Sequence, residues 1–81
     1  MHKITEKEAY EFFDKWIRSY VIMSALMLGV DWQPRITRWE FDIVDELIDH
    51  NGTITVARVR QICGFEEIRQ LDYLQGWVHP L

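Results

Sequence analysis

The stretch that decides the fold spans residues 51–78 and holds two helix-forming segments separated by a glycine. It reads Asn51-Gly52-Thr53-Ile54-Thr55-Val56-Ala57-Arg58-Val59-Arg60-Gln61-Ile62-Cys63-Gly64 and, further on, Arg69-Gln70-Leu71-Asp72-Tyr73-Leu74-Gln75-Gly76-Trp77-Val78. Threonine is a preferred N-cap and glycine a frequent helix terminator, so helices are predicted over residues 55–63 and about 66–75. The β-branched residues 53–55 are expected to form a short strand that pairs with residues 77–79.

A long helix is predicted at the start of the chain. Thr5-Glu6-Lys7-Glu8 has the pattern of a capping box, in which a threonine hydroxyl and a glutamate carboxylate satisfy each other's backbone N–H groups. The helix is expected over residues 5–29, because Gly29 is a suitable terminator. Apolar residues spaced three and four apart are expected to form its inward face, namely Ala9, Phe12, Phe13, Trp16, Ile17, Tyr20, Met23 and Met27.

A second helix is predicted after a short connector, Asp31–Arg35, in which Pro34 disfavours helical backbone at the preceding residue. Thr37-Arg38-Trp39-Glu40 has the pattern of another capping box. The helix is expected to run to the Asn51-Gly52 break. Its inward face is expected to be Trp39, Ile43, Val44, Leu47 and Ile48.

The predicted fold class is mainly α, a compact four-helix arrangement with at most a minimal two-stranded β pairing. With 81 residues, of which 48% are apolar and 14% aromatic, the chain can fold as one domain with a small core rich in aromatic side chains. Residues 1–81 are therefore expected to form a single domain. It would consist of the long helix over residues 5–29 and a core over residues 37–79.

The order of helix, short strand, helix, turn, helix and strand resembles winged helix-turn-helix regulators, most closely the DeoR-like type. The resemblance covers about Arg38 to Val78, where the Gly-Thr-Ile-Thr-Val string and the Leu-x-x-Leu-x-Gly ending are similar to the family's segments. The segment between Gly64 and Gly76 is several residues shorter than in the family, and too few residues follow Val78 to build a wing. The resemblance implies a degenerate, wingless core that binds DNA. The residues that would contact DNA are Arg58, Arg60, Arg69 and Gln70.

The charge pattern points away from nucleic acid. The formal net charge is −4, and residues 1–30 hold four acidic and four basic residues, so the acidic excess lies beyond Gly29. A general electrostatic attraction to phosphate is therefore absent. The alternative is a purely structural role for Arg58, Arg60 and Arg69. They would then form surface ion pairs with nearby carboxylates such as Glu66, Glu67 or Asp72.

Four carboxylates recur at three- and four-residue spacing on the second helix, which places them in one row. They are Asp42, Asp45, Glu46 and Asp49. Such a row is commonly a solubilising surface. The sharper hypothesis is a protein partner with a basic surface, and a phage-type inhibitor of a host nucleic-acid-handling complex, such as a CRISPR or other defence effector, would have this size and charge. Trp32 and Arg35 on the connector are added as interface candidates, although the aromatic residues can also serve only as core.

A third hypothesis is a small oligomeric structural or assembly subunit. The apolar run from Tyr20 to Leu28 is shorter than the roughly 20 residues that cross a bilayer, so no membrane association is expected. Its apolar residues surround most of the helix, which predicts burial in the core together with a homodimer contact. The predicted contact residues are Tyr20, Met23 and Met27.

No catalytic constellation is expected, so the chain is predicted to be a non-enzyme without cofactor or metal. Cys63 lies at a predicted helix end, where the dipole disfavours a thiolate, and it is expected to be a buried apolar residue. His2, His50 and His79 are scattered and show no metal-ligand spacing. One cysteine and no recognisable leader favour a cytoplasmic location.

Overall fold

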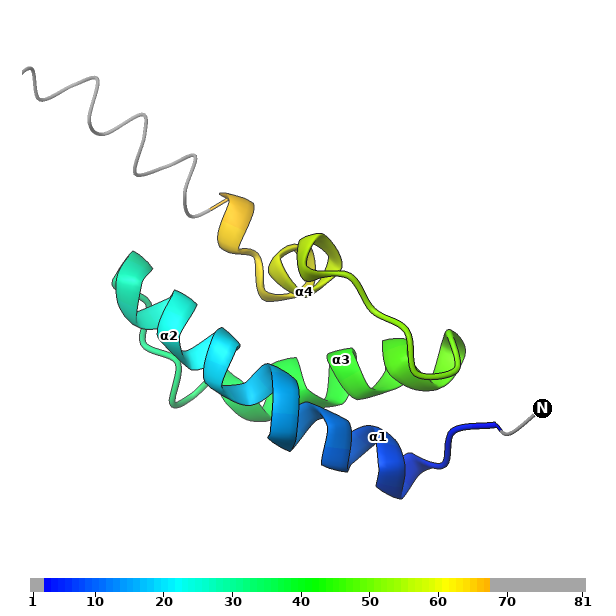
Figure 1. The fold of residues 1–81 in the computed structure, drawn as a ribbon. Coiled ribbons are helices and arrows are strands. Elements are labelled where there is room, and N and C mark those ends of the chain that lie inside the picture. The colour runs from blue at the N-terminus through cyan, green and yellow to red at the C-terminus, as the bar shows by residue number, and fades with distance from the viewer. Residues whose placement is uncertain (1–2, 68–81) are drawn as a thin grey trace, which may run out of the picture.

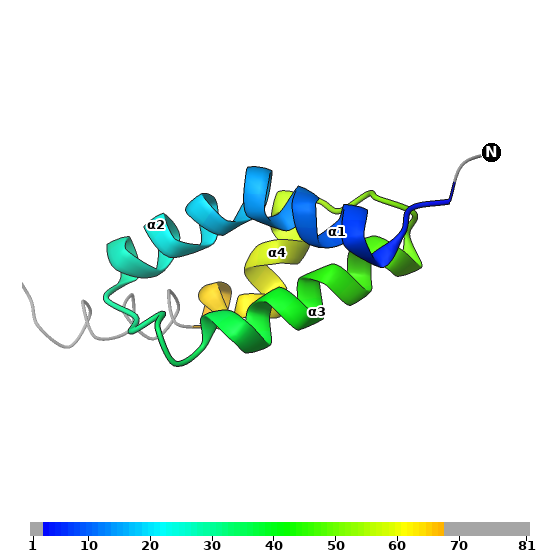
Figure 2. The same ribbon diagram turned by 90° about the horizontal axis from the view of Figure 1, so that it is seen from below.

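The computed structural model describes residues 3–67, and within them the chain is mainly helical, as predicted. The elements are α1 (Glu6–Phe12), the π-helical segment η1 (Phe13–Ile17), α2 (Arg18–Leu28), α3 (Ile36–Asp49) and α4 (Val56–Cys63). α1, η1 and α2 follow one another as a single long rod, and α3 returns alongside it (Figure 1). α4 packs against both α2 and α3 (Figures 1 and 2).

The predicted signals at helix ends are confirmed at four positions. The Thr5 hydroxyl accepts a hydrogen bond from the Glu8 backbone N–H, and the Glu8 carboxylate accepts one from the Thr5 N–H, which completes the capping box. Thr55 caps α4 by accepting from the Arg58 N–H. Gly29 and Gly64 end α2 and α4 in the left-handed conformation, with φ of 73° and 75°.

The predicted capping box at Thr37 is wrong. The N-cap of α3 is Arg35, two residues before Thr37, so the helix begins at Ile36; the Arg35 side chain makes no capping hydrogen bond. The backbone N–H groups of Arg35 and Ile36 both donate to the Trp32 carbonyl, at 3.0 and 2.8 Å. The connector therefore coils directly into the helix, and Thr37 already lies in its first turn.

The expected strand over residues 53–55 does not form in the described part of the chain. These residues lead in extended backbone to the N-cap of α4, where Thr55 has φ −93° and ψ 156°. The proposed partner, residues 77–79, lies outside the described residues. Residues 65–67 are helical, so the last predicted helix starts one residue earlier than expected. The rest of this predicted helix, residues 68–75, also lies outside the described residues.

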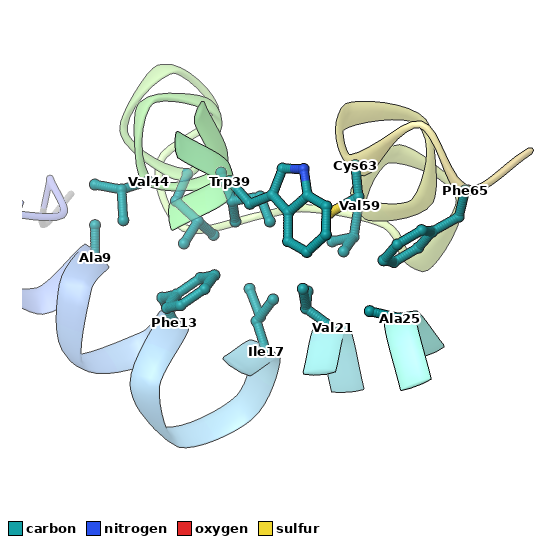
Figure 3. Close-up of a cluster of buried hydrophobic side chains, with 12 residues drawn as sticks. Ala9, Phe13, Ile17, Val21, Ala25, Trp39, Val44, Val59, Cys63 and Phe65 are labelled. Atoms are coloured by element: carbon teal, nitrogen blue, oxygen red, sulfur yellow. The ribbon is translucent and has the colours of Figure 1, made fainter. Parts of the chain in front are cut away.

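One apolar core joins all the helices (Figure 3). Within it Trp39 and Phe65 meet edge to face, with ring centroids 5.4 Å apart and ring planes at 73°. The predicted inward face of α3 is confirmed, with Ile48 partly buried. The buried members are Ala9, Phe13, Ile17, Val21, Ala25, Trp39, Ile43, Val44, Leu47, Val59, Cys63 and Phe65.

The predicted inward face of the first helix is partly wrong. Its buried residues recur strictly every four positions, as Ala9, Phe13, Ile17, Val21 and Ala25, which form one row in Figure 3. The expected members Trp16, Met23 and Met27 are instead exposed.

The π segment explains why a strict four-residue repeat can stay buried. In a straight α-helix residues four apart drift by about 40°, so Ala9 and Ala25 would diverge by about 160°. Both are nevertheless fully buried. In η1 the Arg18 N–H donates to the carbonyl of Phe13, five residues earlier, so this turn holds an additional residue. The additional residue rotates the buried positions of α2 back toward the core by roughly 100° about the helix axis.

Candidate protein-binding surface

The four carboxylates of the predicted row lie on α3, on the side that its buried residues leave free. The pattern of α3 directs Trp39, Ile43 and Leu47 into the core, so polar residues occupy the rest of its circumference. All four carboxylates line one shallow depression of about 310 Å³ between α3 and α4. Its lining residues are Asp42, Asp45, Glu46, Asp49, Arg58 and Ile62.

The carboxylates differ in what they contact. Asp42 forms an ion pair with Arg38, one turn earlier, at 3.3 Å. Glu46 accepts from the Arg58 Nε at 3.0 Å and lies 3.4 Å from the His50 Nε2. Asp45 and Asp49 are exposed and form no ion pair within residues 3–67. The outward negative charge of the depression therefore comes mainly from these two residues.

The Arg58 side chain is held by hydrogen bonds to side chains of α3 and α4. Its guanidinium contacts both Glu46 carboxylate oxygens, through Nε at 3.0 Å and Nη2 at 3.3 Å, and also donates to the Gln61 side chain at 2.9 Å. The hydrogen bond from Arg58 lowers the pKa of Glu46, and the same bond raises the pKa of Arg58. This two-point contact ties α4 to α3.

Arg60 is held in the same way on the other side of α4. Its Nε donates to a Glu66 carboxylate oxygen at 2.6 Å, and its Nη1 donates to the Tyr20 hydroxyl of α2 at 3.4 Å. Both described arginines of the predicted DNA-binding set thus have carboxylate partners. The other two members, Arg69 and Gln70, lie outside the described residues.

The connector candidates behave differently from each other. Trp32 is partly buried and packs against the core, so it acts mainly as a core residue. Arg35 is exposed, and its Nη1 donates to the Asp31 carbonyl at 3.3 Å. Of the predicted oligomer contacts, Met23 and Met27 are exposed, whereas Tyr20 is partly buried.

Phe41 is an interface candidate that the sequence reasoning missed. Its side chain is 52% exposed although it is a large aromatic residue. It lies four residues before Asp45, so the two share one face of α3. The signal was present in the sequence, because Phe41 falls outside the inward repeat of Trp39, Ile43 and Val44.

Cys63 is buried in the core, as predicted, and carries a thiol rather than a thiolate near neutral pH. Burial, with a smaller contribution from the charge of Asp42, raises the pKa of the Cys63 thiol to about 12. A nucleophilic role would require the thiolate. Within residues 3–67 no group of three or more His, Cys, Asp and Glu side chains is arranged to hold a metal ion.

Comparisons with protein-family models, curated proteins and solved structures give no match for this chain. None of the helices in residues 3–67 combines the length and apolar content of a membrane-spanning segment. Function is therefore argued from the surfaces themselves.

Proposed function

We propose that the chain is a non-enzymatic protein-binding module that docks on a basic protein surface through the outward side of α3. The binding residues are Phe41, Asp42, Asp45 and Asp49, which together are called the α3 acidic surface. The observation that carries the proposal is the distribution of ion pairs. Among residues 3–67, Asp45 and Asp49 are exposed and have no cationic partner, whereas Arg58 and Arg60 are bound to Glu46 and Glu66.

The composition of the α3 acidic surface suits an interface. Unpaired carboxylates accelerate encounter with a positively charged partner and disfavour negatively charged ones. An exposed aromatic ring beside them supplies the kind of side chain that contributes most to interface energy. A partner that normally holds a nucleic-acid backbone offers the complementary basic groove, and a phage-type inhibitor of such a protein fits this description.

The competing hypothesis of a DNA-binding regulator gains less support from the same contacts. To reach phosphate, Arg58 would have to leave two hydrogen bonds to Glu46, and Arg60 would have to leave Glu66. Each departure would expose a carboxylate to the DNA backbone. Affinity for DNA follows the number of phosphates neutralised. Replacing an arginine–carboxylate contact by an arginine–phosphate contact, while a carboxylate becomes exposed, therefore adds little affinity for DNA.

Capture from a host extract with the tagged full-length chain tests the proposal. The variant Asp45→Lys/Asp49→Lys should lose a specific captured protein, and soluble duplex DNA should compete with that capture. Glu67→Lys is the control for charge alone, because it reverses an exposed carboxylate outside the α3 acidic surface.

A gel-shift assay with duplex DNA separates the two hypotheses. The proposal expects no shift by the purified protein at physiological salt. It is refuted if the protein shifts DNA with a steep salt dependence and Arg58→Ala/Arg60→Ala abolishes the shift. It also fails if Asp45→Lys/Asp49→Lys captures the same proteins as the wild type.

A further inference from the structure

The turn that follows α3 places two successive residues in the left-handed region of backbone conformation. Asn51 has φ 51° and Gly52 has φ 91°. Asparagine and glycine adopt this conformation more readily than other residues, which explains why this pair ends the helix. Asn51 is exposed, and it is the single asparagine in the sequence. Because Gly52 has no Cβ, its backbone nitrogen can also be approached closely by the side chain of the asparagine before it.

The start of the chain contacts this turn (Figures 1 and 2). The Ile4 backbone N–H donates to Asn51 Oδ1 at 2.6 Å, and the two residues are 47 positions apart in the sequence. A Cβ atom added to Gly52 would lie 3.4 Å from Ile4 Cδ1, so the Ile4 side chain lies directly beside the glycine. The Gly52 N–H donates to the Leu47 carbonyl at 2.7 Å. Hydrogen bonds therefore hold both the side-chain amide of Asn51 and the backbone nitrogen that follows it.

We propose that Asn51 is a site of spontaneous deamidation, and that its contact with Ile4 slows this modification. The Gly52 nitrogen loses its proton and bonds to Asn51 Cγ. The bond from Cγ to the side-chain nitrogen breaks, and this nitrogen takes up a proton and leaves as ammonia, so that a five-membered succinimide ring remains. Water then adds to one of the two ring carbonyls and opens the ring. Opening at Cγ gives aspartate, and opening at the backbone carbonyl gives isoaspartate, in which the backbone runs through the side chain.

Ring closure requires two hydrogen bonds to break. The Gly52 N–H has to leave the Leu47 carbonyl before the nitrogen can lose its proton. The Asn51 side chain has to leave the Ile4 N–H before it can turn onto that nitrogen. Segments near the ends of a chain open locally at a lower free energy than the core does. The reaction therefore proceeds from molecules in which residues 3–5 have left the turn, and the fraction of such molecules sets the rate.

The two products have different effects on the turn. Aspartate adds one negative charge and keeps an oxygen that can accept from the Ile4 N–H. Isoaspartate adds a methylene group to the backbone at a residue whose left-handed φ places the next N–H on the Leu47 carbonyl, so the end of α3 and the Ile4 contact are both lost. The inference does not rest on the proposed function, because the α3 acidic surface contains neither Ile4 nor Asn51.

Incubation of the full-length chain at neutral pH and physiological temperature, followed by peptide mapping with mass spectrometry, measures the modification. The wild type should form both aspartate and isoaspartate at Asn51, because the ring opens in two ways. Ile4→Pro should react about 2- to 10-fold faster than Ile4→Ala, which is the change in opening that the loss of one hydrogen bond produces. Ile4→Ala is the matched control, because both variants lose the isoleucine side chain and only proline also removes the N–H donor. Circular dichroism checks that both variants fold.

The dependence of the wild-type rate on urea is a second test, which needs no variant. Departure of residues 3–5 from the turn exposes little surface, so the deamidation rate should change little with urea below the unfolding transition. Above the transition the rate should rise to that of the unfolded chain, in which no contact protects Asn51.

Four results would overturn the proposal. A wild-type rate that follows the global unfolding curve at all urea concentrations shows that only complete unfolding makes Asn51 reactive. Equal rates for Ile4→Pro and Ile4→Ala show that the Ile4 N–H does not control the reaction. A slower reaction of Ile4→Pro shows that this N–H promotes attack instead, by stabilising negative charge on Asn51 Oδ1. Aspartate without isoaspartate shows that water attacks the side-chain amide directly and that no ring forms.

Discussion

The π segment leads to an unusual prediction, that one residue can be deleted from the middle of the first helix without unfolding the protein. A π turn is an α turn that holds an additional residue. Deletion of Asp14 should therefore convert η1 into regular α-helix. On a straight α-helix, the five buried residues from Ala9 to Ala25 would then cover an arc of about 80° around the helix axis. Without the deletion, they would cover an arc of about 160° on a straight helix.

The energetic cost of this deletion should be small. Asp14 is exposed, and among residues 3–67 its side chain forms one ion pair, with Arg18 at 3.3 Å. Pairs of this kind contribute between 0 and about 1 kcal/mol. We therefore expect the free energy of unfolding to change by no more than about 1 kcal/mol, with helix content unchanged.

Deletion of Asp42 in α3 is the matched control. Asp42 has the same relationship to Arg38, an ion pair one turn apart at 3.3 Å. α3 has no π turn to absorb the loss, so Ile43, Val44 and Leu47 would rotate by about 100° relative to Trp39. Exposing three such side chains costs about 5–9 kcal/mol, at about 1.5–3 kcal/mol each. The whole stability of a chain of 81 residues is only about 4–12 kcal/mol.

Urea unfolding followed by far-UV circular dichroism, with both variants at the same low concentration, measures the difference. The expected result is a cooperative transition close to that of the wild type for the Asp14 deletion, and no folded baseline for the Asp42 deletion. If both deletions unfold the protein, η1 is not a one-residue insertion, and the explanation of the buried four-residue repeat is wrong.

Three further predictions concern single side chains. Phe65→Ala should cost about 3–5 kcal/mol in urea unfolding because Phe65 is fully buried, whereas Phe41→Ala, the same change at an exposed site, should cost less than about 0.5 kcal/mol. Thr55→Ala removes an N-cap and should cost about 1 kcal/mol, and Thr37→Ala, which removes no cap, should cost less than half as much; equal costs would contradict the observed start of α3. Because the folded pKa of Glu46 lies below its unfolded value of about 4.3, the stabilisation it contributes is present above that pH and is lost as the pH falls through the folded pKa. Stability measured from pH 6 to pH 3 should therefore fall less steeply in Glu46→Gln than in the wild type, and identical slopes would refute this role.

The helix ends could be predicted from sequence because their signals are local. A threonine followed three residues later by a glutamate makes its hydrogen bonds within one turn, as at Thr5, and a glycine at a helix end needs only its own backbone freedom, as at Gly64. Thr37 shows the limit of such a signal. The Trp32 carbonyl accepts from the N–H groups of Arg35 and Ile36, so α3 begins before Thr37 and the same motif lies inside the helix rather than at its start.

The inward face of the first helix could not be predicted, because its direction depends on a backbone feature without a local sequence signal. Apolar residues surround α2, so several faces fit the periodicity equally well. The π turn decides between them by turning Val21 and Ala25 inward and leaving Met23 and Met27 outside. A count of apolar positions on an ideal helical wheel places these residues differently.

The charged residues show a similar limit. The spacing of Asp42, Asp45, Glu46 and Asp49 correctly placed all four on one side of α3, since spacing alone determines the face of a helix. The spacing could not show which carboxylates have partners, because the contact of Glu46 with Arg58 joins residues twelve positions apart in different helices. Hence Arg58 could be counted as a DNA contact, although the fold uses it to join α3 and α4.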